Sequence, residues 1–460
     1  MVTFIQTING YLWGFPMIAF LFFVHIFLTV KTGFVQRKVL AGVRISLKKD
    51  STTDDSITPF GALATSLAST LGTGNIIGVS TAVTLGGAGA VFWCWITGVF
   101  GMATQYCECF LSVKYREKSG ESEYCGGPMY VLKNGVKSRR MGFVYALLAS
   151  IGGLITGAAI QTNAISSVVF ETFKSSEHEL SKWDSFLISA LIGTVVAVLT
   201  ALVIFGGLRS VSQVCSMVVP FMAAAYALGC FAVLYINREF FHETIKVIVS
   251  EAFSLKSSAG GVVGSALMLS CRYGASRGLF SNEAGIGTSS VICASAENTN
   301  PVKQGLVSMT ATFWDTVVMC LITGLVVVST GISGEFNARE LSGAGLCYEA
   351  FCRIPYIGRG VLVFSIVVFA LSTVLGWSAI GEKCFVFMFG GKSVGIYRMF
   401  WIGAVFVSAF VSLEFVWAVG DLINAVLVLP NVTALLLLGN EVKKETRQNL
   451  NSVSKTKNSR

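Results

Sequence analysis

Long apolar segments alternate with short polar segments along almost the whole chain. A helix needs about 20 mostly apolar residues to cross a bilayer, and the sequence offers eleven such segments. Their predicted bounds are 12–32, 59–85, 88–113, 141–170, 185–206, 211–236, 262–295, 304–331, 356–388, 393–412 and 415–438. The pattern therefore predicts an all-α polytopic membrane protein with eleven spans.

The composition agrees with this prediction. Of the 460 residues, 53% are hydrophobic and 13% are charged, whereas an ordinary soluble domain has roughly 25% charged residues. Too few charged side chains are present to cover a water-exposed surface, which excludes a soluble enzyme. The net charge of +9 does not indicate a nucleic-acid partner, because the basic residues are confined to short stretches between apolar segments. With three His and no CxxC pair, no zinc, haem or other cofactor is expected.

The basic residues also predict the orientation of the chain. Six, seven and six Lys or Arg residues occur in the stretches 31–49, 114–140 and 441–460. The loops between them are poorer, with two, three and two in 171–184, 237–257 and 332–356. Because cytoplasmic loops are enriched in Lys and Arg, the N-terminus is predicted outside and the C-terminus in the cytoplasm. The polar tail is expected to be disordered.

After the first span, the remaining ten fall into two groups of five. An odd number of spans in each group inverts the second group relative to the first, as in many secondary transporters. The predicted division begins with an N-terminal helix and basic loop (1–58) and a first repeat (59–236). An extracellular loop (237–261), a second repeat (262–438) and a disordered basic tail (439–460) follow.

Two of the predicted spans contain polar, glycine-rich interruptions. The second span contains Gly72-Thr73-Gly74-Asn75, and the seventh contains Ser281-Asn282-Glu283-Ala284-Gly285-Ile286-Gly287. Close helix packing would explain the glycines but not the carboxylate, which costs about 2.5 kcal/mol or more at mid-membrane. Irregular backbone at this depth is tolerated where it lines a wet cavity. Each interruption lies in the first helix of its group, a position typical of a transporter's binding site.

Unwinding a span exposes new helix ends at the centre of the bilayer. Free N–H groups and the positive dipole end suit a carboxylate, whereas free carbonyls suit Na⁺ or an ammonium group. A zwitterionic amino acid needs both kinds of group. The two interruptions therefore predict a site for such a substrate.

Several motifs resemble those of the alanine or glycine:cation symporter family. They are Thr65–Tyr115, Arg277–Gly287 (RGLFSNEAGIG), Phe313–Thr316 (FWDT) and Ser372–Lys383 (STVLGWSAIGEK). The resemblance covers essentially the whole chain. It implies a LeuT-type core of ten helices in a 5+5 inverted repeat, preceded by one extra N-terminal transmembrane helix. It also implies Na⁺-coupled uptake of small neutral amino acids (alanine, glycine, possibly serine) across the plasma (inner) membrane.

The resemblance further implies which residues contact the substrate. Backbone N–H groups of Thr73 and Gly74 would bind its carboxylate, and Gln161 would reach the same site from the fourth span. The bulk of Trp377 would limit the pocket to small side chains. The alternatives are glycine packing at Gly74 and a buried interhelical hydrogen bond at Gln161. The residues expected to bind substrate are Thr73, Gly74, Gln161, Phe280, Asn282, Gly376 and Trp377.

A second set of residues is implied for sodium. In the LeuT-type arrangement, the hydroxyls of Ser372 and Thr373 would share an ion with backbone carbonyls near Ala68 and Leu71. A second ion could use Asn75 and Asp315, although Asp315 could instead pair with Arg272 or Arg277. Glu108 in the third span is expected to hydrogen-bond the unwound backbone at 281–287, and Arg277 to form a gate pair. The residues expected to bind sodium are Ala68, Leu71, Asn75, Asp315, Ser372 and Thr373.

Three other classes of protein compete with a sodium symporter. A proton-coupled or exchange-type amino-acid permease of the same fold remains open at this stage. A channel is disfavoured because filter loops are usually repeated, whereas the two interruptions differ in sequence. A membrane-embedded hydrolase needs a nucleophile with a base, or a metal cluster, and of the three His only His25 lies in a predicted span.

Overall fold

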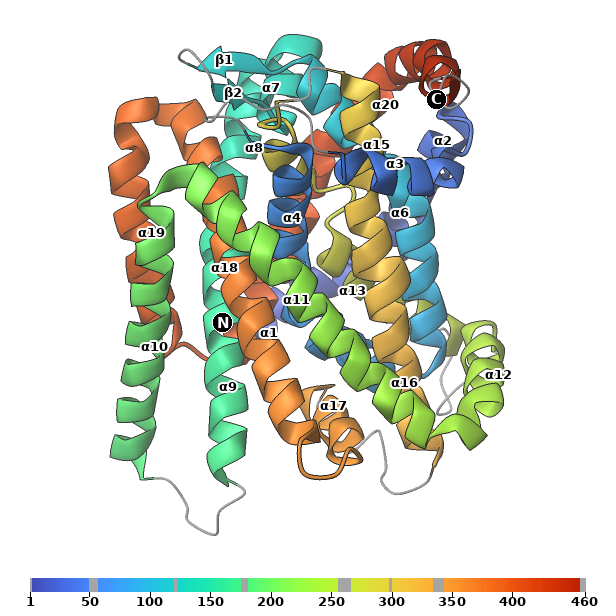
Figure 1. Cartoon of the computed structure of the whole chain (residues 1–460), viewed down its shortest axis with the longest axis vertical. Helices are drawn as coiled ribbons and strands as arrows, with labels where there is room; N and C mark the ends of the chain where they lie inside the picture. The colour runs from blue at the N-terminus through green and yellow to red at the C-terminus, as the bar shows by residue number, and fades with distance from the viewer. Residues whose placement is uncertain are drawn as a thin grey trace.

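A computed structural model describes residues 2–48, 57–119, 123–174, 181–254, 266–297, 300–333 and 343–455. Most of this part of the chain is helical (Figure 1). The α-helices are α1 (Val2–Leu12), α2 (Phe15–Lys31), α3 (Val39–Ser46), α4 (Pro59–Thr70), α5 (Val79–Gly86), α6 (Gly89–Lys114), α7 (Pro128–Tyr130), α8 (Arg139–Gly152), α9 (Ile160–Lys174), α10 (Lys182–Ile204), α11 (Gly207–Ile236), α12 (Phe241–Ala252), α13 (Ala266–Asn282), α14 (Thr288–Cys293), α15 (Pro301–Thr312), α16 (Leu321–Ile332), α17 (Gly343–Cys352), α18 (Gly358–Phe389), α19 (Val394–Ser408) and α20 (Leu413–Lys455).

Short segments of tighter or wider helical geometry connect some of these helices. The wider π-helical turns η2, η4 and η6 interrupt long helices, and such turns are frequent at functional sites. A small antiparallel hairpin completes the secondary structure. The bounds are η1 (Val35–Lys38), η2 (Gly74–Gly78), η3 (Val131–Gly135), η4 (Gly153–Ala159), η5 (Arg238–Phe240), η6 (Phe313–Cys320), η7 (Gly391–Ser393), β1 (Glu117–Ser119) and β2 (Glu123–Cys125).

The long helices form a bundle of membrane-spanning length (Figure 1). Six stretches in the described part of the chain are long and apolar enough to cross a bilayer, and two bent helix pairs raise the number to eight. The bent pairs are α1 with α2 (45°) and α4 with η2–α5 (51°). The chain is thus a multi-pass membrane protein, and the arrangement of eleven spans as 5+5 stays a prediction. The six stretches are Arg139–Phe170, Trp183–Ile204, Gly207–Ile236, Pro301–Ile332, Gly358–Phe389 and Glu414–Asn449.

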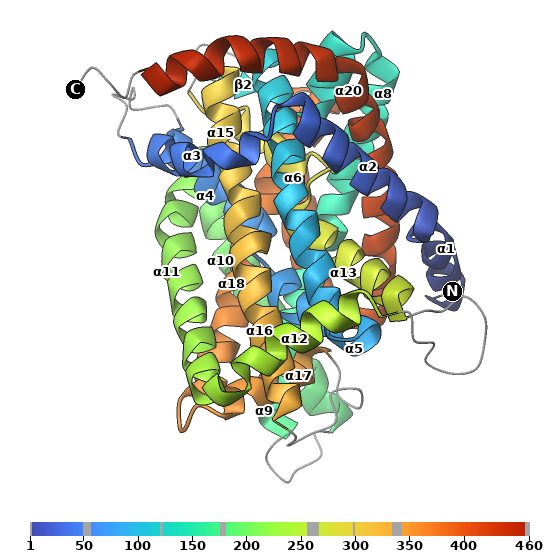
Figure 2. The same cartoon turned by 90° about the vertical axis from the view of Figure 1, so that its right-hand side faces the viewer.

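The basic segments of the sequence gather at one end of the bundle. Figures 1 and 2 show α3, the β1–β2 hairpin and the last part of α20 at the same end, with α12 and α17 at the opposite end. The charge pattern predicts that these segments share one side of the membrane. The structure places them at one end of the bundle, in agreement with this prediction.

The expectation of a disordered tail from 439 onward is wrong for the described residues. Helix α20 continues through Lys455 and runs across the end of the bundle in Figure 2. It is docked through one narrow face, because Val442 and Thr446 are buried and Tyr106 Oη lies 2.9 Å from Thr446 Oγ1. Two buried positions four residues apart give too short an apolar pattern to recognise in a polar, basic sequence. Residues 456–460 lie outside the described part.

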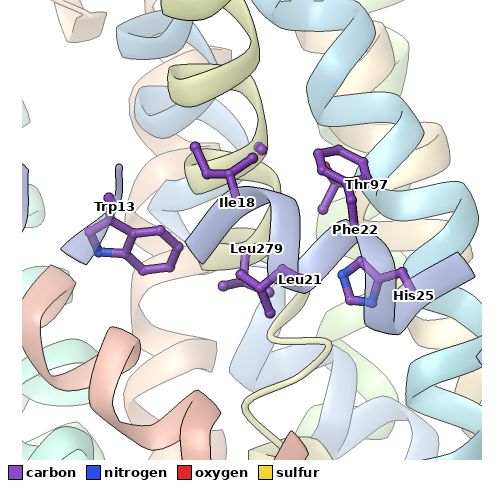
Figure 3. Close-up of a pocket in the computed structure, with 8 residues that line it drawn as sticks. Trp13, Ile18, Leu21, Phe22, His25, Thr97 and Leu279 are labelled. Atoms are coloured by element: carbon purple, nitrogen blue, oxygen red, sulfur yellow. The ribbon is translucent and has the colours of Figure 1, made fainter. Parts of the chain in front are cut away.

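The N-terminal helices α1 and α2 pack against three helices, α6, α13 and α20, that also contribute to the site described below. Near its bend, Asn9 Nδ2 donates to the carbonyl of Ala418 at 2.7 Å and Trp13 Nε1 to that of Asp421 at 3.1 Å, both on α20. Beyond the bend, α2 covers α6 and α13. Figure 3 shows the small apolar pocket at this contact, lined by Trp13, Ile18, Leu21, Phe22, His25, Thr97, Ala275 and Leu279.

Candidate functional site

The first predicted interruption is a true break in the structure. Helix α4 ends at Thr70, and Leu71 has non-helical backbone angles (φ −71°, ψ 83°). In a continuing helix the N–H of Gly72 would bond the carbonyl of Ala68, but it donates instead to Asn75 Oδ1 at 3.0 Å. A side chain that competes with the backbone in this way ends the helix. The last carbonyls of α4 are consequently left for other partners.

The second interruption is a break from Glu283 to Gly287, between α13 and α14. The backbone φ is positive at Glu283 (55°), Gly285 (103°) and Gly287 (87°). Glycine adopts such angles easily, whereas Glu283 carries a Cβ and must be held there by its surroundings. Both interruptions that the sequence indicated are therefore unwound.

Three other helices hold the second break in place. Glu108 Oε1 on α6 accepts hydrogen bonds from the N–H of Gly285 and from Asn431 Nδ2, each at 2.7 Å. Asn431 on α20 also donates to the carbonyl of Gly285 at 2.9 Å, and Tyr145 Oη on α8 donates to that of Ile286 at 2.8 Å. The prediction that Glu108 bonds the unwound backbone is confirmed.

A small buried cavity lies where the two breaks meet. Its volume, about 10 Å³, is close to the minimum that one water molecule needs, so the site is in a closed state. Polar groups inside the membrane usually mark a substrate or ion pathway, and most of the lining is polar. The lining residues are Ser69, Thr70, Gly72, Gly74, Thr156, Gln161, Phe280, Glu283, Thr373, Trp377 and Asn424.

Several residues singled out from the sequence meet at this cavity. Gln161 Oε1 accepts hydrogen bonds from the N–H (3.3 Å) and the hydroxyl (3.1 Å) of Thr73, which joins Thr73 to the site. The ring of Phe280 lies against Gly74, where a Cβ would be 3.2 Å from Phe280 Cδ1. The predicted residues that line the cavity directly are Gly74, Gln161, Phe280, Thr373 and Trp377.

Three of the predicted substrate residues do not line the cavity: Thr73, which reaches it through Gln161, and also Gly376 and Asn282. Gly376 packs against α4, where a Cβ would be 2.6 Å from the backbone nitrogen of Ser69, so its small size permits a close helix contact. Asn282 Oδ1 accepts a hydrogen bond from the N–H of Ala284 at 2.9 Å and thereby helps to end α13. The prediction of direct pocket contacts for Gly376 and Asn282 is corrected by their local packing.

Of the two hydroxyls proposed for sodium, only one reaches the end of α4. Thr373 Oγ1 donates to the carbonyl of Leu71 at 3.3 Å and to that of Phe369, in its own helix, at 2.9 Å. Ser372 Oγ donates to the carbonyl of Phe369 at 2.8 Å and lies 3.3 Å from the sulfur of Met222 on α11. Ala68 is fully buried in the last turn of α4. The structure therefore brings together Leu71 and Thr373, with Ala68 one turn earlier in α4, while the Ser372 hydroxyl faces α11.

A second polar cluster surrounds Asp315 on η6. Asp315 Oδ1 accepts a hydrogen bond from Asn75 Nδ2 at 2.8 Å. Its Oδ2 accepts from Ser281 Oγ at 2.9 Å and from Thr316 Oγ1 at 2.6 Å. Arg272, one of the alternative partners of Asp315, lies over the neighbouring tyrosine ring. Asn75 and Asp315 are thus in direct contact, together with a residue from the end of α13.

Arg277, the other alternative partner, pairs with Asp421 on α20. Two hydrogen bonds, Nη1 to Oδ1 at 3.2 Å and Nη2 to Oδ2 at 3.3 Å, join the two side chains. The guanidinium lies 4.8 Å from the ring centre of Trp417, which is 4.7 Å from that of Phe280. Because Phe280 lines the cavity, these side chains form a layer over it. The alternative that Arg277 pairs with Asp315 is wrong.

Asn424 and Glu283 are among the lining residues to which sequence reasoning assigned no role. Asn424 on α20 is buried, and its Oδ1 has no hydrogen-bond partner within the described residues. The available signal was a polar amide within the apolar segment 415–438, which contains Asn424 and Asn431. No sequence signal distinguished the lining hydroxyls of Ser69, Thr70 and Thr156, because Ser and Thr hydroxyls can bond the backbone of their own helix in any span.

A closed polar cavity between two broken helices in an apolar bundle defines a membrane transporter rather than an enzyme. The chain matches the model of the sodium:alanine symporter family over residues 1–460 and belongs to that family. This confirms the family that the motifs indicated.

Two relatives and one solved structure illustrate the similarity. The chain is 38% identical over 453 residues to the sodium/alanine symporter AgcS of Methanococcus maripaludis. The alignment covers 97% of this chain and 96% of AgcS. It is 30% identical over 448 residues to the probable sodium/glutamine symporter GlnT of Bacillus subtilis. This alignment covers 96% of this chain and 90% of GlnT. The solved structure is MhsT in complex with L-phenylalanine, with a TM-score of 0.54 at 11% identity over 86% of this chain and 99% of that one. The last similarity shows the fold alone.

Proposed function

We propose that this protein is a sodium-coupled symporter that imports alanine and glycine by alternating access. The main support is the closed polar cavity at which both helix breaks meet. The breaks offer N–H groups for a carboxylate and helix-end carbonyls for cations. In the proposed cycle, substrate and Na⁺ bind from outside, the layer around Phe280 closes, and the bundle rocks to open the site inward. No covalent bond changes, so no catalytic residue is required.

The packing around Trp377 supports a small substrate. Trp377 is buried, and Gly157 on η4 lies so close that a Cβ there would be 2.3 Å from Trp377 Cβ. An indole held by close packing cannot rotate away without moving a helix. Together with Phe280, it would limit the substrate to side chains the size of those of glycine, alanine or serine.

We assign the first sodium ion to the oxygens of Ala68, Leu71 and Thr373, and a second to Asn75 and Asp315. One Na⁺ that moves down a potential of about 100 mV gains roughly 2.3 kcal/mol. A tenfold concentration ratio adds about 1.4 kcal/mol. One ion would therefore support accumulation of the amino acid by a factor of a few hundred.

We further propose an inner-membrane topology with eleven spans, the N-terminus outside and the C-terminus in the cytoplasm. The repeats would comprise 59–236 and 262–438. The support is that the basic segments all lie at one end of the bundle (Figure 2), which the positive-inside rule assigns to the cytoplasm.

Purified protein in liposomes tests the function directly. Uptake of labelled alanine is measured with an inward Na⁺ gradient and with K⁺ replacing Na⁺ on both sides. We expect saturable, concentrative uptake only with the Na⁺ gradient. Undiminished accumulation without Na⁺ would instead indicate a proton-coupled or exchange-type permease of the same fold.

A substitution at Gln161 tests the position of the pocket. We expect Gln161→Ala to weaken alanine binding about 10-fold or more, because the hydrogen bonds that position Thr73 are lost. Asn163→Ala is the matched control on the same helix, since Asn163 donates to the carbonyl of Val411 away from the cavity. Equal alanine affinities in wild type and Gln161→Ala, measured by competition binding, would mean that the pocket lies elsewhere.

The pair of Arg277 and Asp421 provides a test of the covering layer. We expect Arg277→Gln to speed the release of bound alanine about 10-fold, because a charge-assisted pair contributes about 1.5–3 kcal/mol to holding the layer closed. Adding Asp421→Asn should cost little more, since the two side chains act together. Release rates of the single and double variants are compared after rapid dilution. Fully additive effects would contradict the proposed coupling.

A further inference from the structure

Three carboxylates are buried near the two helix breaks, and they differ in their surroundings. Within the described residues, Glu108, Glu283 and Asp315 form no ion pair with Lys or Arg. Glu108 binds the backbone of the second break, and Asp315 accepts three side-chain hydrogen bonds. Glu283 accepts a side-chain hydrogen bond from Thr288, also interacts with the side chain of Trp377, and lines the cavity. Glu283 is therefore the carboxylate that a ligand in the cavity would meet.

The remaining lining of the cavity carries no other ionisable side chain. It consists of hydroxyls, amides, glycines and two aromatic rings, with no Lys, Arg or His. A buried carboxylate without a cationic partner is costly, and in a site that excludes water its attraction for a positive charge is strong. The cavity is thus electrostatically suited to a ligand with a cationic group.

A second acceptor in the same cavity is independent of Glu283. Asn424 on α20 is buried, and its side-chain oxygen has no hydrogen-bond partner within the described residues. Rotation of the amide exchanges the positions of its oxygen and nitrogen, so either end can face a ligand. A buried polar group without a partner calls for a ligand or a water.

At the other helix break, Thr73 presents hydrogen-bond donors at the cavity. The N–H and the hydroxyl of Thr73 both point at one oxygen, Gln161 Oε1. That amide oxygen is the kind of acceptor that a substrate carboxylate would provide. One break is thus matched to the negative end of a zwitterion, and the other, with Asn424, to its positive end.

We propose that Glu283 and Asn424 form the subsite for the ammonium group of the substrate, so that transport requires a protonated amine. This inference rests on the proposed function and deepens it. The carboxylate and the amide oxygen accept N–H donors of the ammonium group, while the Thr73 side of the cavity binds the carboxylate. A hydroxy acid of the same size has no ammonium group and would leave Glu283 unpaired.

The first test needs no variant. Competition with labelled alanine is measured at saturating Na⁺ on the purified full-length protein, with unlabelled L-alanine and L-lactate as competitors. We expect lactate to compete at least 100-fold more weakly than alanine. Competition by lactate within about threefold of alanine would overturn the proposal.

The second test assigns the discrimination to the two residues. We expect Glu283→Gln to weaken alanine binding about 10- to 100-fold while the weak binding of lactate stays the same, so that the alanine-to-lactate ratio falls. Asn424→Leu should change the ratio in the same direction by about 10-fold. Na⁺ affinity without amino acid, measured as thermal stabilisation, should stay within threefold of wild type in both variants. Asn163→Ala is the control outside the cavity and should change nothing.

The outcomes separate this inference from the proposed function. Two results would overturn the ammonium subsite. One is an alanine-to-lactate affinity ratio that Glu283→Gln leaves unchanged, and the other is a loss of Na⁺ affinity in that variant instead of a loss of alanine affinity. If Glu283→Gln does not fold, Asn424→Leu and the wild-type competition decide the question. Failure of the proposed function would be seen elsewhere, as an absence of Na⁺-stimulated alanine uptake by the wild-type protein in liposomes.

Discussion

Replacement of Thr373 by valine is expected to lower the apparent affinity for Na⁺ about 10-fold or more. Valine has nearly the same shape as threonine but lacks the hydroxyl oxygen. That oxygen lies 3.3 Å from the Leu71 carbonyl, at the end of α4 where unpaired carbonyls would complete the ion site. The measurement is alanine uptake in liposomes over a range of Na⁺ concentrations, where the concentration for half-maximal uptake should rise.

Thr310→Val is the matched control for this prediction. Thr310 is also fully buried, and its hydroxyl donates to the carbonyl of Val307 in its own helix. Thr310→Val also removes a hydrogen bond from a hydroxyl to the backbone of its own helix, but it affects neither helix break. The Na⁺ dependence of uptake should therefore stay as in wild type. If Thr373→Val retained wild-type Na⁺ dependence, the first sodium ion could not use this hydroxyl.

Replacement of Glu108 by leucine is expected to destabilise the folded protein by about 2–4 kcal/mol, because it removes a shared acceptor of buried donors. The N–H of Gly285 would lose its hydrogen bond, and Asn431 would lose one of its two. Glu108→Gln retains an amide oxygen that can accept the same bonds, and its effect should be much smaller. Thermal melting in detergent, followed by loss of monodisperse protein, measures both variants.

Asn431→Leu provides the cross-check on the same network. Because Asn431 and Glu108 bond each other and the same peptide unit, the double substitution should cost less than the sum of the single ones. Equal losses of stability for Glu108→Gln and Glu108→Leu would show that a negative charge, not an acceptor, holds the second break.

Local signals in the sequence predicted the two breaks and one of their supports. Glycines beside Asn75 and Glu283 interrupt apolar segments, and this combination is unfavourable in a continuous span, so the pattern itself indicates unwinding. Glu108, a carboxylate in the third span, was predicted to hydrogen-bond the unwound backbone at 281–287, and it does so at Gly285. Each of these signals lies within a short stretch of chain.

Predictions that depended on the direction of a side chain were less successful. Ser372 and Thr373 are adjacent, yet successive residues of a helix point about 100° apart, and only the Thr373 hydroxyl reaches α4. Asn282 lies in the correct motif but bonds the backbone of its own break. Glu283, one residue later with a positive φ, lines the cavity instead. Motif membership did not distinguish these neighbours, because it does not specify helix rotation.

The sequence alone was enough to predict a membrane protein of the sodium:alanine symporter family, with two broken helices and its basic segments at one end. These properties follow from segment length, composition and short motifs, which act locally. Tertiary structure decided which helix Arg277 pairs with, that Asn424 joins the cavity, and that the polar tail docks as a helix on the bundle. Each of these contacts joins residues far apart in the chain. They depend on how the helices rotate and pack against one another, because only packing brings distant polar groups close enough to satisfy one another away from water.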